Sequence, residues 1–304
     1  MDNKQQGRYL DAKHIKAFKE GVFKKILDGV IEDPELSLEI RRENETMVYY
    51  HKDKILTTSF KKGKPSIASL DKKYYEGREK PKTQIEDISK LKSLTTIRDY
   101  FKEAKQIVNQ WKAEKKKLGE EFIYQQNIAL GNQSTENNFL VVDMEWTYSQ
   151  AEIEKEKRNK TRIDLVAIDT RLNATGSNDI FLIELKVGTK ATDNKSGIID
   201  HIEKTAKIIN DDYARQALVN DVKSIIECKS DLGLIKGEAK TFNFSSCEKP
   251  KMMLILVYRG EVEKKQLEQE ETKAIEKAEE LGIILKTMKI NALIPINTNE
   301  DNLT

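Results

Sequence analysis

The amino-terminal part of the chain changes from one hydrophobic period to another. Apolar residues first recur at three- and four-residue steps, which predicts an amphipathic helix over about 11–29: Ile15, Phe18, Val22, Phe23 and Ile26. Three short runs rich in β-branched and aromatic residues follow, with turn-prone residues between them, at 36–43, 45–52 and 54–60. These runs predict a small antiparallel meander, followed by a loop-rich connection that contains prolines and glycines.

The rest of the chain repeats this change of period twice. A helical pattern runs from about 95 to 129, with Gly119 as a candidate break, and a second one runs from 197 to 228. Between them lie three strand-like runs, at 139–148, 162–169 and 179–188. After the second helical stretch come a buried strand, an exposed helix and a last strand, at 252–260, 263–282 and 283–290.

This order of elements predicts an α/β (α+β) protein. A strand that returns to the same sheet through a helix makes a parallel crossover, so we expect a mixed central β-sheet flanked by helices. We place a small N-terminal α+β region with a basic linker at 1–94, the mixed-sheet domain at 95–295 and a disordered tail at 296–304.

Composition is typical of a folded protein of the cytoplasm. Of the 304 residues, 38% are hydrophobic, enough for a core. No apolar run is long enough to span a bilayer, and the first residues lack the apolar centre of a signal peptide. The two cysteines, Cys228 and Cys247, lack metal-ligand spacing, in agreement with a reducing compartment. We therefore expect a cytoplasmic location and no membrane partner.

The net charge of +2 is uninformative, but its distribution is uneven. Between 61 and 117 basic residues exceed acidic ones, in runs such as "KKGKP" and "WKAEKKK". This excess is a candidate contact surface for a polyanion. A solvated, lysine-rich helix surface explains the same runs, and the charge distribution alone favours that explanation.

The strand-like run "DIFLIELKVG" holds two charges among apolar residues. Side chains alternate along a strand, so Glu184 and Lys186 share one face. On the preceding strand Asp164 is a lone charge within "IDLVAI". Buried carboxylates are costly unless a cation neutralises them, which a divalent metal does, so Asp164 and Glu184 are candidate metal ligands. The alternative is a purely structural ion pair between Lys186 and a carboxylate, although such pairs seldom improve stability over apolar residues.

From about 115 to 260, "RIDLVAID" followed by "IELKVG" resembles the PD-(D/E)xK nuclease superfamily, whose fold is restriction-endonuclease-like. The resemblance implies that Asp164 and Glu184 bind Mg²⁺ or Mn²⁺ with the backbone carbonyl of Leu185. It also implies that Lys186 positions or activates the attacking water. Ile163 stands where the proline that names the superfamily would be.

Four further residues are candidates for the same site. The superfamily often adds a glutamate from the first core helix, and helical spacing favours Glu121 over its neighbour. Glu145 on the first strand is a second acid, although a surface carboxylate is an equal alternative. His201 and Lys204 begin the helix after the third strand, where they could meet a phosphate, although an ordinary helix residue explains His201 more simply.

We therefore expect a metal-dependent nuclease that hydrolyses phosphodiester bonds, in DNA rather than RNA. The expected partner is nucleic acid, with a homo-oligomer or a partner protein also open. Two alternatives have different consequences: a catalytically inactive nuclease-fold protein that binds nucleic acid, and a structural subunit of a larger complex.

Overall fold

A computed structural model describes residues 7–61, 63–77, 85, 89, 91, 93–115, 120–149, 160–188, 197–245 and 248–292. The chain forms two compact units, the first from Met1–Gly131 with Asn220–Lys236 and the second from Asn132–Val219 with Gly237–Thr304. The boundary expected after residue 94 falls at the first residue of helix α3, inside the first unit. The predicted tail and parts of the basic segment 61–117 lie outside the described residues.

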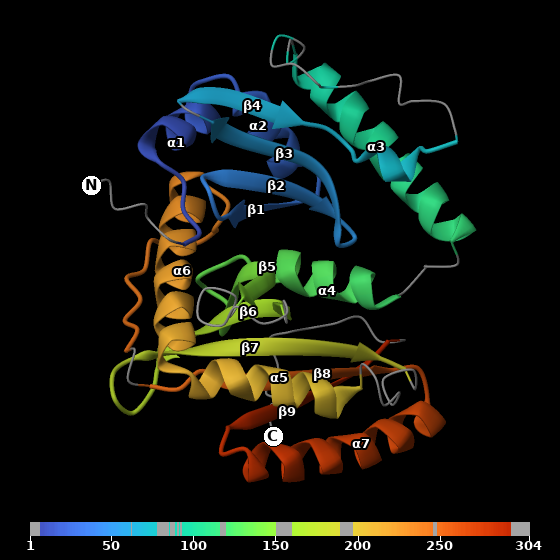
Figure 1. The fold of residues 1–304 in the computed structure, drawn as a ribbon, viewed down its shortest axis with the longest axis vertical. Helices are drawn as coiled ribbons and strands as arrows, with labels where there is room; N and C mark the ends of the chain where they lie inside the picture. Colours follow the sequence, from blue (N-terminus) through green and yellow to red (C-terminus); the bar gives the residue numbers. More distant parts are fainter. Residues whose placement is uncertain are drawn as a thin grey trace. The chain divides into compact units, whose positions relative to one another are not determined.

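The first unit combines helices with an antiparallel sheet of strand order β1-β2-β3-β4 (Figure 1). Its elements are α1 (Ala12–Lys19), α2 (Lys24–Glu32), β1 (Ser37–Arg41), β2 (Glu45–Tyr50), β3 (Asp53–Lys61), β4 (Lys64–Ala68), the 3₁₀ turn η1 (Lys72–Tyr74), α3 (Leu94–Glu114) and α4 (Glu120–Gly131). The three predicted strands are therefore present, and a fourth joins them.

Two elements of the first unit differ from the sequence pattern. The single opening helix is two helices, because the chain turns at Gly21, where a Cβ would lie 2.9 Å from the Cα of Ala17. The stretch read as a loop contains β4, although Gly63 and Pro65 disfavour a strand. The fourth strand lies at the edge of the sheet, where proline is tolerated because no further strand needs its missing N–H.

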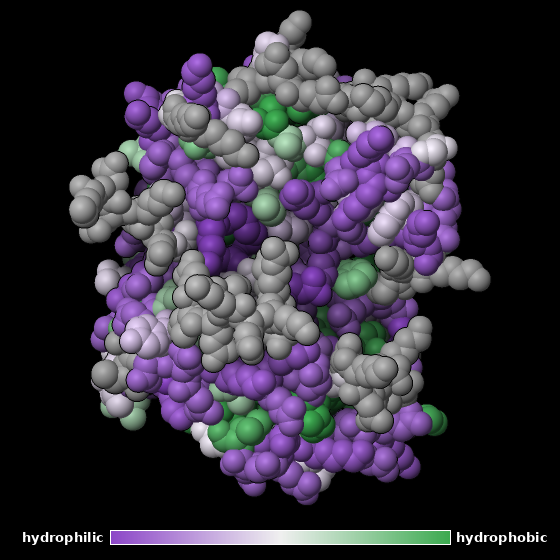
Figure 2. Space-filling model, in the orientation of Figure 1, coloured by the Kyte–Doolittle hydropathy of each residue, from purple (hydrophilic) through white to green (hydrophobic). Residues whose placement is uncertain are grey.

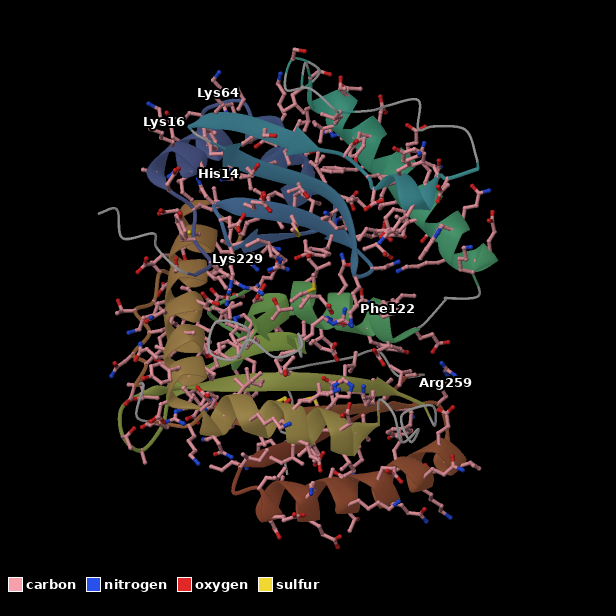
Figure 3. All side chains as sticks on the ribbon, in the orientation of Figure 1. His14, Lys16, Lys64, Phe122, Lys229 and Arg259 are labelled. Atoms are coloured by element: carbon pink, nitrogen blue, oxygen red, sulfur yellow. The ribbon has the colours of Figure 1, made fainter. Side chains whose placement is uncertain are left out.

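His14 lies in the aromatic core of the first unit (Figure 3). Its ring stacks on Phe18 with 5.2 Å between the ring centroids. Nδ1 lies 3.1 Å from the backbone oxygen of Asn44, and Nε2 lies 2.9 Å from the hydroxyl of Thr58. Burial lowers the pKa of His14, against the opposing effect of its hydrogen bonds to Asn44. The folded unit therefore favours the neutral imidazole.

We expect the first unit to lose stability as the pH falls below about 6.5, the ordinary pKa of histidine. Because the pKa of His14 is lowered on folding, the unfolded chain takes up the proton first. The contribution is constant above that pH and falls by up to about 1.4 kcal/mol per pH unit below it. Urea unfolding of wild type and His14→Gln at several pH values measures it. A stability difference between the two proteins that stays the same at every pH would contradict this account.

The C-terminal half of α6 (Asp212–Asp231) belongs to the first unit and is attached there by buried ionic contacts. Lys229 (Figure 3) is 2.8 Å from the carboxylate of Glu39 on β1, and both side chains are buried. The backbone N–H of Arg8 donates to Asp221 at 2.9 Å. These contacts are long-range in sequence, so helical periodicity alone gives no sign of them.

The second unit contains the mixed sheet that the order of elements predicts, which confirms the α+β fold class. Its elements are β5 (Phe139–Ser149), β6 (Lys160–Leu172), β7 (Asn178–Val187), α5 (Ile198–Asn210), the first part of α6, β8 (Lys251–Tyr258), α7 (Glu261–Glu280) and β9 (Leu285–Asn291). The strand order is β5-β6-β7-β8-β9. β5, β6 and β7 are antiparallel neighbours, whereas β7, β8 and β9 run parallel through helical crossovers.

Helices α5 and α7 contact one another and pack on this sheet, α5 on β6 and β7 and α7 on β8 and β9 (Figure 1). The long helix predicted at 197–228 is divided at Asp211, whose carboxylate accepts the N–H of Ala214 at 2.8 Å and so begins α6. The middle strands are almost continuously apolar, and Leu182, Leu185 and Leu254 are fully buried. Charged residues on these strands therefore need a specific explanation.

Among the described residues, the exposed large hydrophobic side chains include Val22, Leu172 and Val262. Figure 2 shows a mainly hydrophilic face with small hydrophobic areas, as expected for a chain in which 34% of residues are charged. Among the described residues, none of the helices has both the length and the apolar character that crossing a bilayer requires.

Candidate active site

Strands β6 and β7 part from each other within the second unit. Their pairing runs as far as Leu165 opposite Ile183. Beyond this point β6 continues to pair with β5, and β7 continues to pair with β8 as far as Val187. The described residues therefore form a fork in the sheet, and the first residues past its branch point are Asp164 and Glu184.

At this fork the carboxylate of Asp164 accepts a hydrogen bond that a backbone carbonyl would accept in a regular sheet. Its Oδ2 accepts the backbone N–H of Leu185 at 3.1 Å, in a buried hydrogen bond. This contact joins β6 to β7 just past the branch point and gives a buried N–H its hydrogen-bond partner. It also places Asp164 beside the backbone of the residue that follows Glu184.

Glu184 accepts two contacts at one oxygen atom. The Nζ of Lys186 lies 2.7 Å from Oε1, and the Nδ1 of His201 lies 2.9 Å from the same atom. His201 belongs to the first turns of α5, which begins after Gly197. Strand β7 and helix α5 thus bring Lys186 and His201 to the same carboxylate oxygen of Glu184, and these three residues were all predicted for the site.

These groups lie in an environment with little water. Asp164, Glu184 and Lys186 are only 5%, 2% and 7% exposed. Electrostatic interactions are stronger in such surroundings than at the surface, because less solvent screens them. A charged substrate or ion that enters the fork would therefore interact strongly with these side chains.

Glu145 lies on β5, in an unusual backbone conformation. Met144 pairs with Leu165 and Trp146 with Ile163, which puts Glu145 level with Asp164. Its φ of 57° is in the left-handed region, which costs a residue with a side chain roughly 1–2 kcal/mol. A strand pattern in the sequence gives no indication of such a residue.

The carboxylate of Glu145 is paired with Arg162 on β6, and the Nε to Oε2 distance is 2.9 Å. The side chain of Arg162 is 58% exposed, whereas that of Glu145 is 10% exposed. Arg162 was not among the predicted site residues. The available signal was its position two residues before Asp164, on the same face of a strand.

The two remaining predicted side chains lie on helices. Lys204 is exposed and pairs with Asp200 one turn earlier on α5, at 2.6 Å. Glu121 lies on α4, in the first unit, and its part in the site stays a prediction.

The donor set suits a hard divalent cation that keeps several waters. Asp164 and Glu184 supply carboxylate oxygens, and Mg²⁺ is commonly bound by one or two carboxylates together with water and substrate phosphate. Among the described residues there is no group of three or more His, Cys, Asp or Glu side chains placed to hold a metal ion. A metal in the fork would therefore have two side-chain ligands, and it would compete with Lys186 and His201 for Oε1 of Glu184.

Comparison of the chain with models of known families, with curated proteins and with solved structures gave no match.

Proposed function

We propose that this protein is a metal-dependent nuclease of the cytoplasm that hydrolyses phosphodiester bonds in DNA. The observation that carries the proposal is the fork between β6 and β7, where two buried carboxylates, Asp164 and Glu184, lie with Lys186 in contact with one of them. Buried charges on a sheet are costly, so their concentration at one point favours a chemical role over a packing role.

Asp164 and Glu184 would hold Mg²⁺ or Mn²⁺, with the backbone carbonyl of Leu185 as the third protein ligand that the superfamily resemblance implies. When bound, such an ion supplies Lewis acidity and positive charge for a phosphoryl group. The contact between Asp164 and the N–H of Leu185 holds this carboxylate against β7, beside the residue that follows Glu184. Preorganisation of this kind lowers the cost of binding the ion.

Lys186 is the group that we assign to the attacking water. Its ammonium contacts Glu184, and a point charge with several rotatable donors suits the orientation of a water molecule or a phosphate oxygen. Hydrolysis adds the hydroxyl of that water to phosphorus and its proton to the leaving oxygen. A buried positive charge stabilises the negative charge that develops on the phosphoryl oxygens, because water screens it little.

One observation favours a second candidate, a protein that binds nucleic acid without cutting it. Oε1 of Glu184 is engaged by Lys186 and His201 together, which is a stable arrangement without a metal ion. The described residues also lack a third carboxylate or histidine placed to complete a metal site. The two candidates differ in metal binding and in cleavage, so experiment separates them.

The test is cleavage of labelled linear duplex, circular duplex and single-stranded DNA, and of RNA, by the full chain with Mg²⁺ or Mn²⁺. We expect cleavage of DNA that depends on the metal and stops when a chelator removes it. Binding of the same DNA without cleavage of any substrate would favour the second candidate. A chain that neither binds nor cleaves nucleic acid would contradict both.

A further inference from the structure

The pair formed by Glu145 and Arg162 is not explained by stability. Arg162 is largely exposed, and ion pairs with an exposed partner add little to the free energy of folding. Glu145 nevertheless occupies a left-handed conformation that residues with side chains rarely adopt. Backbone strain of this kind persists where the surrounding structure imposes it, and it is concentrated at functional sites.

Arg162 lies on the face of β6 that carries Asp164. Pairing of Ile163 with Trp146 and of Thr161 with Tyr148 continues without a bulge, so residues two apart on β6 share a face. If the register of β6 and β7 is continued past the branch point, Arg162 is level with Lys186. Each branch of the fork therefore carries one cation just beyond its carboxylate.

The two cations differ in exposure, and this difference suggests different roles. Lys186 is buried beside Glu184, whereas the guanidinium of Arg162 is open to solvent and held from one side by Glu145. Guanidinium groups bind phosphate with two parallel hydrogen bonds, and they do so best when their orientation is fixed. The contact to Glu145 uses Nε, and the guanidinium carries further N–H donors on its two terminal nitrogens, which suit a phosphate.

We propose that Arg162 binds a phosphate of the nucleic-acid backbone next to the one that is cleaved, and that Glu145 is the residue that positions it. This inference rests on the proposed function and names the contact by which the same site holds its polyanionic substrate. Glu145 acts through Arg162 and does not itself touch the substrate.

The experiment is fluorescence anisotropy of a labelled DNA duplex with the full chain in the presence of a chelator, so that no cleavage occurs. We expect Arg162→Ala to weaken binding about tenfold and to lower the dependence of binding on salt concentration by about one ion. Arg162→Lys keeps the charge but loses the bidentate geometry, and we expect an intermediate affinity.

The matched control is Arg171→Ala. Arg171 lies near the other end of β6, is 56% exposed and pairs with Asp169 at 2.9 Å, so it resembles Arg162 in strand, exposure and ion pairing. We expect DNA affinity to be unchanged in this variant. An equal loss in both arginine variants would overturn the inference, because it would indicate a general charge effect.

The role of Glu145 is tested by a double-mutant cycle on the same measurement. If Glu145 positions Arg162, Glu145→Gln weakens binding in the wild-type background and has no effect in the Arg162→Ala background. Additive losses would overturn the positioning role. Glu145→Gly serves as a second variant, since glycine adopts the left-handed conformation without strain and keeps the strand folded.

Failure of this inference is distinguishable from failure of the proposed function. Wild-type binding that Arg162→Ala leaves unchanged would remove the role of Arg162 and leave the nuclease proposal standing. A wild-type chain that neither binds this DNA nor cleaves it with Mn²⁺ would remove both.

Discussion

Replacement of Lys186 by methionine will lower the rate of DNA hydrolysis by about 100-fold or more, the usual effect of losing a group that transfers a proton or orients the reacting water. Methionine is close to lysine in length and apolar volume, so the loss is mainly one of charge and donors. The same change removes the cation that neutralises Glu184, which is almost fully buried. We therefore also expect the free energy of unfolding to fall, by about 3 kcal/mol in the absence of a divalent ion.

The methionine variant also has an expected result in metal binding. Because Nζ of Lys186 and a divalent ion compete for Oε1 of Glu184, the methionine variant will bind Mn²⁺ at least as tightly as wild type and will recover stability when it does. The matched control is Lys251→Met, which removes a lysine paired with Asp179 on the same sheet and leaves the fork intact. Undiminished cleavage by Lys186→Met in a fully folded state would remove Lys186 from the mechanism.

Replacement of Asp164 by asparagine will lower the rate of cleavage by about 1,000-fold and will weaken Mn²⁺ binding by about 100-fold. The amide oxygen still accepts the N–H of Leu185, so the fork keeps its geometry while one negative ligand is lost. We expect the melting temperature without metal to stay close to that of wild type. Calorimetric titration with Mn²⁺ and a cleavage assay measure the two effects.

Asp179→Asn is the control for that substitution, because Asp179 is an aspartate on β7 that pairs with Lys251, and it takes no part in the fork. It should retain both metal binding and cleavage. Equal Mn²⁺ affinity in wild type and Asp164→Asn would show that the ion binds elsewhere, and the proposed metal ligands would be wrong.

The hydrophobic pattern of the sequence predicted most of the helices and strands. Along the strands, the spacing of apolar residues agrees with which side chains are buried. The alternation that puts Glu184 and Lys186 on one face is also what brings Nζ of Lys186 to the carboxylate of Glu184. Similarly, the change from strand to helix after β7 predicted the parallel crossover to β8. In these cases the residues nearby in the sequence determine where a side chain points or which way the next strand runs.

Other features depend on contacts that are distant in sequence. The left-handed conformation of Glu145 interrupts no hydrophobic pattern, so neither its strain nor its contact with Arg162 was predictable. Helical spacing ranked Glu121 above its neighbour, but a periodic pattern gives the face of a helix and not what that face meets. The helix predicted at 197–228 is divided at Asp211, whose side chain caps the start of α6, although the helical spacing of apolar residues continues through this point.

The fork is tested most directly as an active site by metal-dependent cleavage of a labelled linear DNA duplex by wild type and Lys186→Met, purified in the same way and assayed at equal concentration. We expect cleavage by wild type in Mn²⁺, none with chelator, and a loss of about 100-fold in the variant. Equal rates in the two proteins would indicate a contaminating nuclease, and the assignment of the fork as an active site would then be wrong.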